Sequence, residues 1–225
     1  MRVGVVSDIH SNKFALEVVL ERLEELAPDS IVCAGDIVGY GAHPDECCRI
    51  AADFFDAVVQ GNHDAAVLSG ETSGMNPYAA AAALWTRDKL SPDSKALLGS
   101  LRTSSALDSG NGRVSIFHGS DRDRDEYVHE EMVDPDILAR NDSRFIVLGH
   151  THVPFVCGFP SGLVLNPGAV GQPRDGDPRA SFALLDTEES ACEVIRAEYP
   201  SHEASEAILK AGLPMMLAKR LSVGR

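Results

Sequence analysis

Short apolar runs alternate with amphipathic segments through the first two thirds of the chain. The first run, RVGVV at residues 2–6, is continuous, which is typical of a strand buried on both faces. Apolar residues then recur at helical spacing from Leu16 to Leu26, behind Ser11 and Asn12 as alternative N-caps. The same reasoning predicts strands within 30–36, 56–64, 113–120 and 144–152, and helices over 43–55 and 76–102, the latter broken at Ser91-Pro92.

The last third of the chain follows a different pattern. Four short apolar runs succeed one another without a helix between them, at 155–159, 162–165, 180–186 and 192–198. Two helices are expected to close the chain over 202–211 and 214–222, with Gly212 and Pro214 as stop and restart signals. Alternating strands and helices favour a largely parallel α/β sheet, whereas consecutive strands favour a second sheet or an antiparallel extension. We therefore predict two sheets sandwiched between helices, in a single domain spanning residues 1–225.

Composition narrows the class of protein. A hydrophobic fraction of 44% and a charged fraction of 24% are ordinary for a soluble globular chain. No run is long enough to span a membrane, and the N-terminus shows no secretory signal. The five cysteines form no CxxC pair, which favours a reducing compartment, and we expect a cytoplasmic protein. A formal net charge of −14 argues against binding nucleic-acid polymers, while a small phosphorylated substrate could bind where divalent metals reverse the local charge.

Side chains that can bind metals follow directly on five of the predicted strands. Asp8 and His10 are two positions apart, as are His150 and His152, so in extended segments each pair would face one side. Sites in open α/β folds form beyond the carboxyl ends of strands, so these groups should meet at one edge of the sheet. Each motif alone has a plainer interpretation as a cap, a turn or a polar loop. Five in order are hard to explain as packing.

Together the motifs D-x-H, GD, GNHD, a lone histidine and GHTH resemble the calcineurin-like metallophosphoesterase superfamily, in a prokaryotic branch with GDIVGYG. The segment NPGAVGQPRDGDPRASFALLD at 166–186 extends the resemblance. It implies a four-layer α/β/β/α fold and a two-metal hydrolase. By this resemblance, one metal is held by Asp8, His10, Asp36 and His152, and the other by Asp36, Asn62, His118 and His150. Nitrogen and oxygen donors without thiolates suit Mn, Fe or Zn.

The resemblance also assigns a catalytic role to His63, which does not bind metal in the family. Its role there is proton donation to the leaving oxygen, or stabilisation of charge on the phosphoryl group. Phosphoprotein phosphatases of the superfamily read GDxxDRG at the second motif. Here Gly39 replaces the aspartate that orients the catalytic histidine, and Tyr40 replaces an arginine that grips phosphate. Arg174 or Arg179 could supply the missing grip, and we take Tyr40 and Arg174 as candidate substrate-binding residues.

The leading hypothesis is a dinuclear phosphoesterase that acts on small phosphodiesters or nucleotides through a metal-bridging hydroxide, rather than on phosphoproteins. Two alternatives belong to other classes: a metal-dependent scaffold without activity, and a phosphate or nucleotide sensor that hardly turns over. The substrate, the metal and the oligomeric state, a homo-oligomer included, are left open by the sequence.

Overall fold

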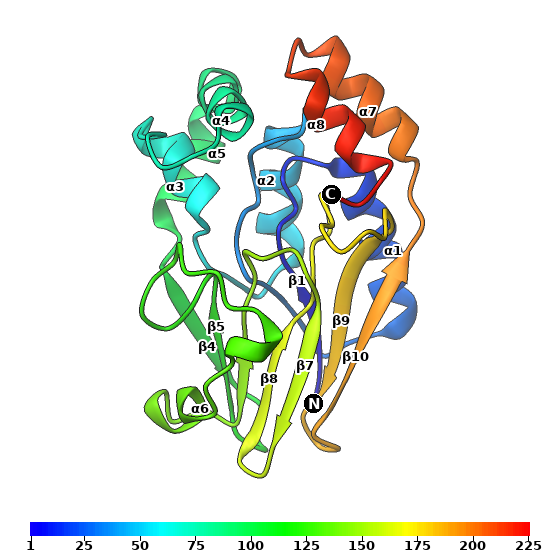
Figure 1. Ribbon diagram of the computed structural model, residues 1–225. Helices are drawn as coiled ribbons and strands as arrows, with labels where there is room; N and C mark the ends of the chain where they lie inside the picture. Colours follow the sequence, from blue (N-terminus) through cyan, green and yellow to red (C-terminus); the bar gives the residue numbers. More distant parts are fainter.

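Two five-stranded sheets pack face to face in the computed structural model, which describes residues 1–225 (Figure 1). Their strand orders are β10-β9-β1-β2-β3 and β4-β5-β6-β8-β7. The first sheet contains β1 (Arg2–Val6), β2 (Ser30–Cys33), β3 (Ala57–Val58), β9 (Ala180–Asp186) and β10 (Ala191–Ala197). The second contains β4 (Ser104–Asp108), β5 (Arg113–Phe117), β6 (Phe145–Val147), β7 (Phe155–Phe159) and β8 (Gly162–Asn166).

Each sheet has a parallel centre. Strands β1, β2 and β3 are parallel, and β9 and β10 extend that sheet in antiparallel fashion. Strands β5, β6 and β8 are also parallel, with β4 and β7 as antiparallel edges. The consecutive strands of the last third therefore divide between the sheets, since β7 and β8 join the second and β9 and β10 return to the first.

The apolar run of β1 is buried on both faces, as its lack of alternation predicts. Val3 and Val5 pack between the sheets against Val114 and Phe145. Val6 belongs to the other core, which lies between the first sheet and the helices. Fully burying such side chains is worth roughly 1.5–3 kcal/mol each, so the strand is held from two sides. The strand ends are thereby fixed in position.

Helices cover the two outer faces unequally. Over the first sheet lie α1 (Lys13–Leu26) and α2 (Pro44–Phe54), joined by α3 (Asn62–Ser69), α4 (Pro77–Lys89) and α5 (Pro92–Ser100). The C-terminal hairpin of α7 (Ser201–Lys210) and α8 (Met215–Leu221) packs beside α1. The second sheet is covered only by the short α6 (Asp136–Arg140) and a 3-10 turn at Glu130–Met132. The predicted sandwich of two sheets flanked by helices is confirmed, with a thin fourth layer.

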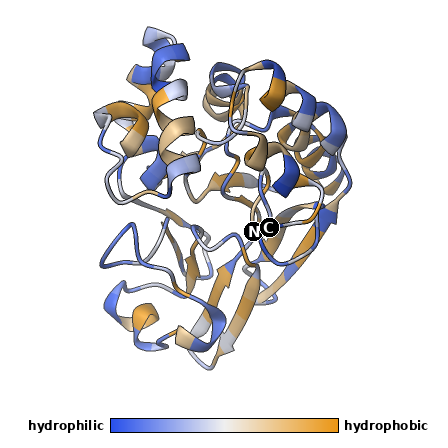
Figure 2. Cartoon of the chain, turned by 45° about the horizontal axis from the view of Figure 1, so that its top comes forward, coloured by the Kyte–Doolittle hydropathy of each residue, from blue (hydrophilic) through white to orange (hydrophobic).

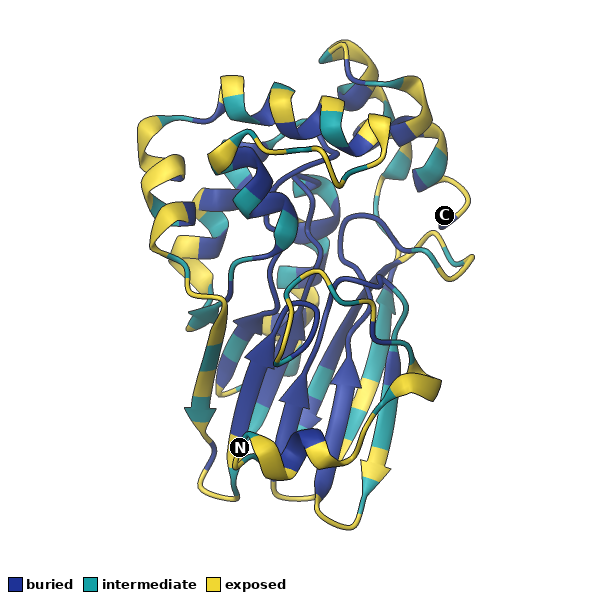
Figure 3. Ribbon diagram, turned by 60° about the vertical axis from the view of Figure 1, so that its left-hand side comes forward, coloured by how far each residue is buried: buried dark blue, intermediate teal, exposed yellow.

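Helix ends agree closely with the sequence signals. Asn12 rather than Ser11 caps α1, because its side chain accepts a hydrogen bond from the backbone N–H of Ala15. The break at Ser91-Pro92 separates α4 from α5, and Ser91 caps α5. Apolar colour concentrates in the strands and on the inner helix faces (Figure 2), and burial follows the same distribution (Figure 3). None of the helices has the length and apolar character needed to cross a membrane.

Three expectations from the sequence need correction. The segment 56–64 forms only the short strand β3, and its GNHD motif is the start of helix α3. Strand β4 was not expected, because SSALD carries little β propensity and is held as an edge by pairing with β5. The metal-binding motifs do not follow strands of one sheet. Those after β1, β2 and β3 belong to the first sheet, and those after β5 and β6 to the second.

Candidate metal centre

The loops that carry the motifs have an unusual backbone conformation. Five of the seven predicted ligands have positive φ: Asp8, His10, Asp36, His150 and His152, at 54°, 50°, 54°, 66° and 59°. Non-glycine residues rarely adopt this region, and each instance costs of the order of 1–3 kcal/mol unless its surroundings impose it. The expectation that 8–10 and 150–152 are extended is therefore wrong. Their side chains converge through left-handed turns instead.

Hydrogen bonds between the loops sustain this conformation. The backbone N–H groups of Asp8 and His10 donate to the carbonyl oxygens of Gly35 and Asp36, at 3.0 and 2.9 Å. Gly149 is needed for the close approach of the GHTH loop, because a Cβ atom there would lie 2.2 Å from Ser7 Oγ. The loops after β1, β2 and β6 thus form one interlocked unit.

One cluster gathers Asp8, His10 and His152, all buried. The Nε2 atoms of His10 and His152 are 3.1 Å apart, and His152 Nε2 lies 3.2 Å from Asp8 Oδ1. Asp36 Oδ2 lies 3.5 Å from His10 Nε2. These four side chains are the ones that the resemblance assigns to the first metal, and the structure brings them together.

The tautomers of the histidines in this cluster indicate which kind of ligand it can hold. His10 Nδ1 donates to the carbonyl oxygen of Val38 and His152 Nδ1 to that of Gln172, at 3.1 and 2.5 Å. A neutral imidazole has one N–H, so both Nε2 atoms present lone pairs. They face Asp8 Oδ1 and Asp36 Oδ2, which are buried and accept no hydrogen bond. Acceptors that converge without a donor fit a cation, and the residues present fit a metal ion.

A second cluster lies on the other side of Asp36. His118 Nε2 lies 3.4 Å from Asp36 Oδ2, 3.1 Å from Asn62 Oδ1 and 3.2 Å from His150 Nδ1. His118 Nδ1 is held by the carbonyl oxygen of Ala34 at 2.7 Å. The same oxygen of Asp36 therefore faces one histidine of each cluster, in the position that a bridging carboxylate needs.

The ionised groups of the centre favour the binding of a positive ion. Burial raises the pKa values of Asp8 and Asp36, but the histidines around them outweigh it and lower both. Burial lowers the pKa of His118, yet Asp36 outweighs that effect and raises it to about 9. The pKa of His150 is lowered to about 4, chiefly by burial. At neutral pH two carboxylates are thus ionised against one protonated histidine, and the site is net negative.

His63 lies against this centre, with a ligand atom within 4.8 Å of those of His10 and Asp36, but its ring has no hydrogen bond to a carboxylate. It is 5% exposed, and its Nδ1 atom is buried without a hydrogen bond. Its backbone N–H donates to Asp36 Oδ1 at 2.8 Å, which leaves Oδ2 free for the clusters. Burial lowers the pKa of His63 to about 4, so the ring is neutral at pH 7. A neutral ring can donate a hydrogen bond but carries no excess proton.

Asp64 was given no role by the sequence analysis, yet it anchors the loop that carries Asp36. Its buried carboxylate accepts from the backbone N–H groups of Asp36, Val38 and Gly61, at 3.0, 3.1 and 3.0 Å. The signal that could have found it is its place three residues after the helix cap, where an acidic side chain returns to the cap N–H. Asp64 therefore anchors the loop that carries Asp36, and it does not orient the ring of His63.

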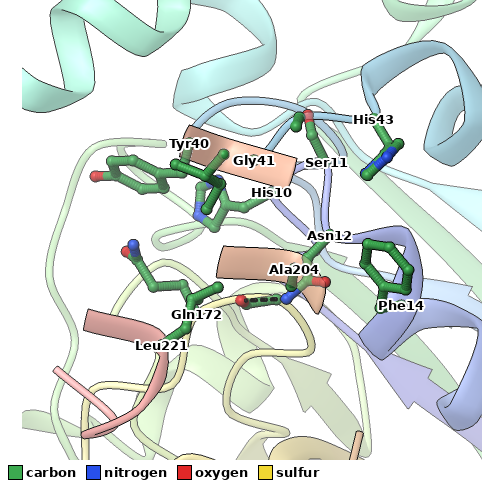
Figure 4. Close-up of a pocket in the computed structure, with 13 residues that line it drawn as sticks. His10, Ser11, Asn12, Phe14, Tyr40, Gly41, His43, Gln172, Ala204 and Leu221 are labelled. Carbon is green, nitrogen blue, oxygen red and sulfur yellow. Dashed lines mark hydrogen bonds between the residues drawn. The ribbon is translucent and has the colours of Figure 1, made fainter. Parts of the chain in front are cut away.

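The candidate substrate-binding residues meet beside the first cluster. Arg174 Nη2 donates to Tyr40 Oη at 3.1 Å, and the guanidinium lies 5.8 Å from the centre of the Tyr40 ring. Arg179 pairs instead with Asp177 at 2.6 Å. Gln172, which the sequence analysis did not single out, is buried, and its Nε2 has no partner. Its side chain and the Tyr40 ring extend to one side of a cavity of about 10 Å³, and Phe14 lines the opposite side (Figure 4).

The chain is similar in sequence and in structure to known metallophosphoesterases. The calcineurin-like phosphoesterase superfamily domain matches residues 1–190. A crystal structure of a metallophosphoesterase from Sphaerobacter thermophilus has a TM-score of 0.85 and 34% identity, covering 100% of this chain and 99% of that one. A Methanocaldococcus jannaschii protein described as uncharacterized is 36% identical over 99% of this chain and 98% of its own. A probable metallophosphoesterase of Methanothermobacter thermautotrophicus is 25% identical over 50% of this chain and 74% of its own.

Proposed function

The chain belongs to the calcineurin-like phosphoesterase superfamily, and from this premise we propose that it hydrolyses small phosphodiesters or nucleotide-type esters with two divalent metal ions. The observation that carries the proposal is Asp36 Oδ2, which is buried without a hydrogen bond and lies 3.5 and 3.4 Å from histidines of the two clusters. A carboxylate oxygen buried in this way needs a counter-charge, and a metal ion that displaces the proton of His118 would supply it.

The metals would be held by the seven side chains that resemblance assigns, Asp8, His10, Asp36, Asn62, His118, His150 and His152. When bound, a pair of metals polarises a phosphoryl group and lowers the pKa of a coordinated water toward ~7. The donors are nitrogen and oxygen atoms without thiolates, which favours Mn, Fe or Zn. The backbone carbonyls at Val38, Ala34 and Gln172 fix the histidine tautomers, and so aim the correct ring nitrogen at the ion.

His63 would act directly on the substrate. Its ring lies beside that of His10, with the centroids 4.8 Å apart, so it can reach a phosphoryl group held at the first cluster. Its low pKa favours a neutral imidazole that donates a hydrogen bond to the phosphoryl oxygens over one that delivers a proton. Preorganised donation of this kind is worth roughly 10²–10³-fold in rate.

Arg174 would grip the substrate phosphate. Its guanidinium makes no ion pair, its Nε atom is buried without a partner, and Tyr40 Oη holds its Nη2 atom. Arg174→Ala should raise KM by roughly 10–100-fold, the equivalent of about 1.5–3 kcal/mol for a charged hydrogen bond. Arg179→Ala is the matched control and should leave KM unchanged, because Arg179 is already paired with Asp177.

The function is tested with bis(p-nitrophenyl) phosphate and p-nitrophenyl phosphate on protein that has been stripped of metal and reloaded. We expect about two metals per chain, reversible loss of activity on chelation, and a diester rate at least comparable to the monoester rate. The diester expectation follows from Gly39-Tyr40, which takes the place of an arginine suited to a dianionic monoester and leaves Arg174 as the one arginine proposed to contact the phosphate.

Other outcomes would favour the alternatives. Two bound metals without hydrolysis or phosphate binding would indicate a scaffold. Phosphate binding without turnover would indicate a sensor. A strong monoester preference, or ready dephosphorylation of phosphopeptides, would contradict the proposed substrate class. Full activity in exhaustively chelated protein would contradict the metal mechanism altogether.

A further inference from the structure

His63 needs an orienting partner that the sequence does not supply in the usual form. A Cβ atom added at Gly39 would lie 2.5 Å from His63 Nδ1, so no carboxylate fits at that position. Asp64 is occupied by three backbone N–H groups. The ring of His63 therefore has to be fixed by something other than a hydrogen bond to an acid.

Contacts with two neighbouring aromatic rings fix the ring of His63 instead. The centroid of the Tyr40 ring lies 4.5 Å from that of His63, at an interplanar angle of 49°. His10 lies 4.8 Å from His63 at 79°, and Tyr40 lies 4.5 Å from His10 at 60°. Three aromatic rings in mutual contact leave His63 few rotamers, and the packing density of a protein interior makes the alternatives costly.

Tyr40 is itself held on three sides. Its backbone has a positive φ of 51°, and its ring lies against those of His10 and His63. Its hydroxyl accepts a hydrogen bond from Arg174. Its ring belongs to an apolar cluster with Ile208, Leu217 and Leu221 of the C-terminal hairpin. That hairpin lies beyond residue 190, where the matched family domain ends.

We propose that Tyr40 is the positioning residue for His63, and that the hairpin of α7 and α8 acts on the reaction by bracing Tyr40. The inference rests on the proposed function, in which His63 contacts the substrate. It assigns the ring of Tyr40 a role separate from that of its hydroxyl, which holds Arg174. A change to the ring should therefore alter kcat, whereas a change to the hydroxyl should alter KM.

The experiment compares four variants with the metal-loaded enzyme on bis(p-nitrophenyl) phosphate. Tyr40→Phe keeps the ring and should retain kcat while KM rises. Tyr40→Leu should retain both metals and lower kcat by roughly 10²-fold, the cost of misplacing a catalytic group by about 1 Å. His63→Ala combined with Tyr40→Leu should be no slower than His63→Ala alone, because residues that act through one another are not additive.

Controls separate positioning from stability. Tyr199→Leu removes another partly buried tyrosine that packs on the same cluster but has no ring contact with His63, and it should leave kcat unchanged. If Tyr40→Leu does not fold, Leu217→Ala tests the same inference from the hairpin side and should lower kcat with both metals retained. Equal loss of kcat in the Phe and Leu variants, metal loss in Tyr40→Leu, or multiplicative effects with His63→Ala would each overturn the proposal.

A readout that does not depend on activity keeps the two proposals distinguishable. In zinc-loaded protein, the ring protons of His63 should show a ring-current shift from Tyr40 that persists in Tyr40→Phe and disappears in Tyr40→Leu. If the enzyme hydrolyses no phosphoester but this shift behaves as expected, the proposed function fails and the positioning contact stands. If hydrolysis occurs and the His63 signals are the same in all three proteins, the positioning role fails alone.

Discussion

The two halves of the centre are closed to different degrees. In the first, His10 and His152 are 1% and 2% exposed, each is fixed by a backbone carbonyl, and the cavity that His10 lines measures only about 10 Å³. In the second, His150 has a buried Nε2 without a partner, and the ring against it is that of Tyr127, which is 49% exposed. The histidines of the second half, His118 and His150, are also buried, at 1% and 5% exposed, so the two halves differ in the half-exposed ring that covers the second.

The two halves also differ in the number of carboxylates that they contain. The first half has two carboxylates, Asp8 and Asp36, whereas the second has Asp36 and the neutral amide of Asn62. A divalent ion should therefore bind more tightly in the first half, because it gains more Coulomb energy there and its ligands are already in place. The second half should then release its ion more readily than the first.

The largest effect is expected where the halves meet. Asp36→Asn should weaken both sites and lower kcat by roughly 10⁴-fold, since about 5–6 kcal/mol of metal-derived stabilisation is lost. Asp8→Asn is the matched change within one half, and should empty the first site while the second keeps its ion. Metal content by mass spectrometry, measured beside kcat, checks both. Equal metal loss in the two variants would contradict the bridging position of Asp36.

His63→Ala should lower activity without loss of metal. We expect both metals to remain and kcat to fall by roughly 10²–10³-fold, as for loss of one preorganised hydrogen-bond donor. Because the ring is neutral at pH 7, the loss should be similar on an alkyl ester and on a p-nitrophenyl ester. A much larger loss on the alkyl ester would mean that His63 protonates the leaving oxygen, which p-nitrophenolate barely needs.

The pH dependence of metal binding should distinguish the halves. His118, with its pKa raised to about 9, holds a proton in metal-free protein, and an ion must displace it. Affinity at the second half should therefore fall about tenfold per pH unit as the pH drops below about 9. His10 and His152 have lowered pKa values and release no proton at neutral pH. Calorimetry in buffers of different ionisation enthalpy counts the protons, and release of a proton from both sites would contradict a difference in protonation between the halves.

The smallest effect concerns the cover of the second half. Tyr127→Ala should uncover His150 and speed dissociation of the second ion by about tenfold, the low end of the range for groups that support a metal ligand. Dissociation from the first half should not change. The rates can be followed with a chromogenic chelator, and Tyr78→Ala, at another exposed tyrosine, serves as the control. An unchanged or slower release from the second half would show that Tyr127 does not shield the site.

Much of the centre could be predicted from the order of residues alone. Strand ends are readable because burial on both faces makes β1 and β6 continuous apolar runs, and the polar residue that follows marks the end of each. A side chain able to bind metal next to a strand end can be seen without long-range information, and the resemblance then assigns it to a metal. The seven predicted ligands therefore come together in two clusters, although the left-handed turns that aim five of them were not anticipated.

Tertiary structure alone decided how these groups work together. The sequence determined which donors are present and that they follow the ends of apolar runs, because both depend on local pattern. It could not place Asp36 between two histidine clusters, assign Asp64 to the metal loop, or set Tyr40 against His63 with the C-terminal hairpin behind it. Those contacts join residues far apart along the chain, and their distances are fixed only when two sheets and their helices pack to the density of a protein interior.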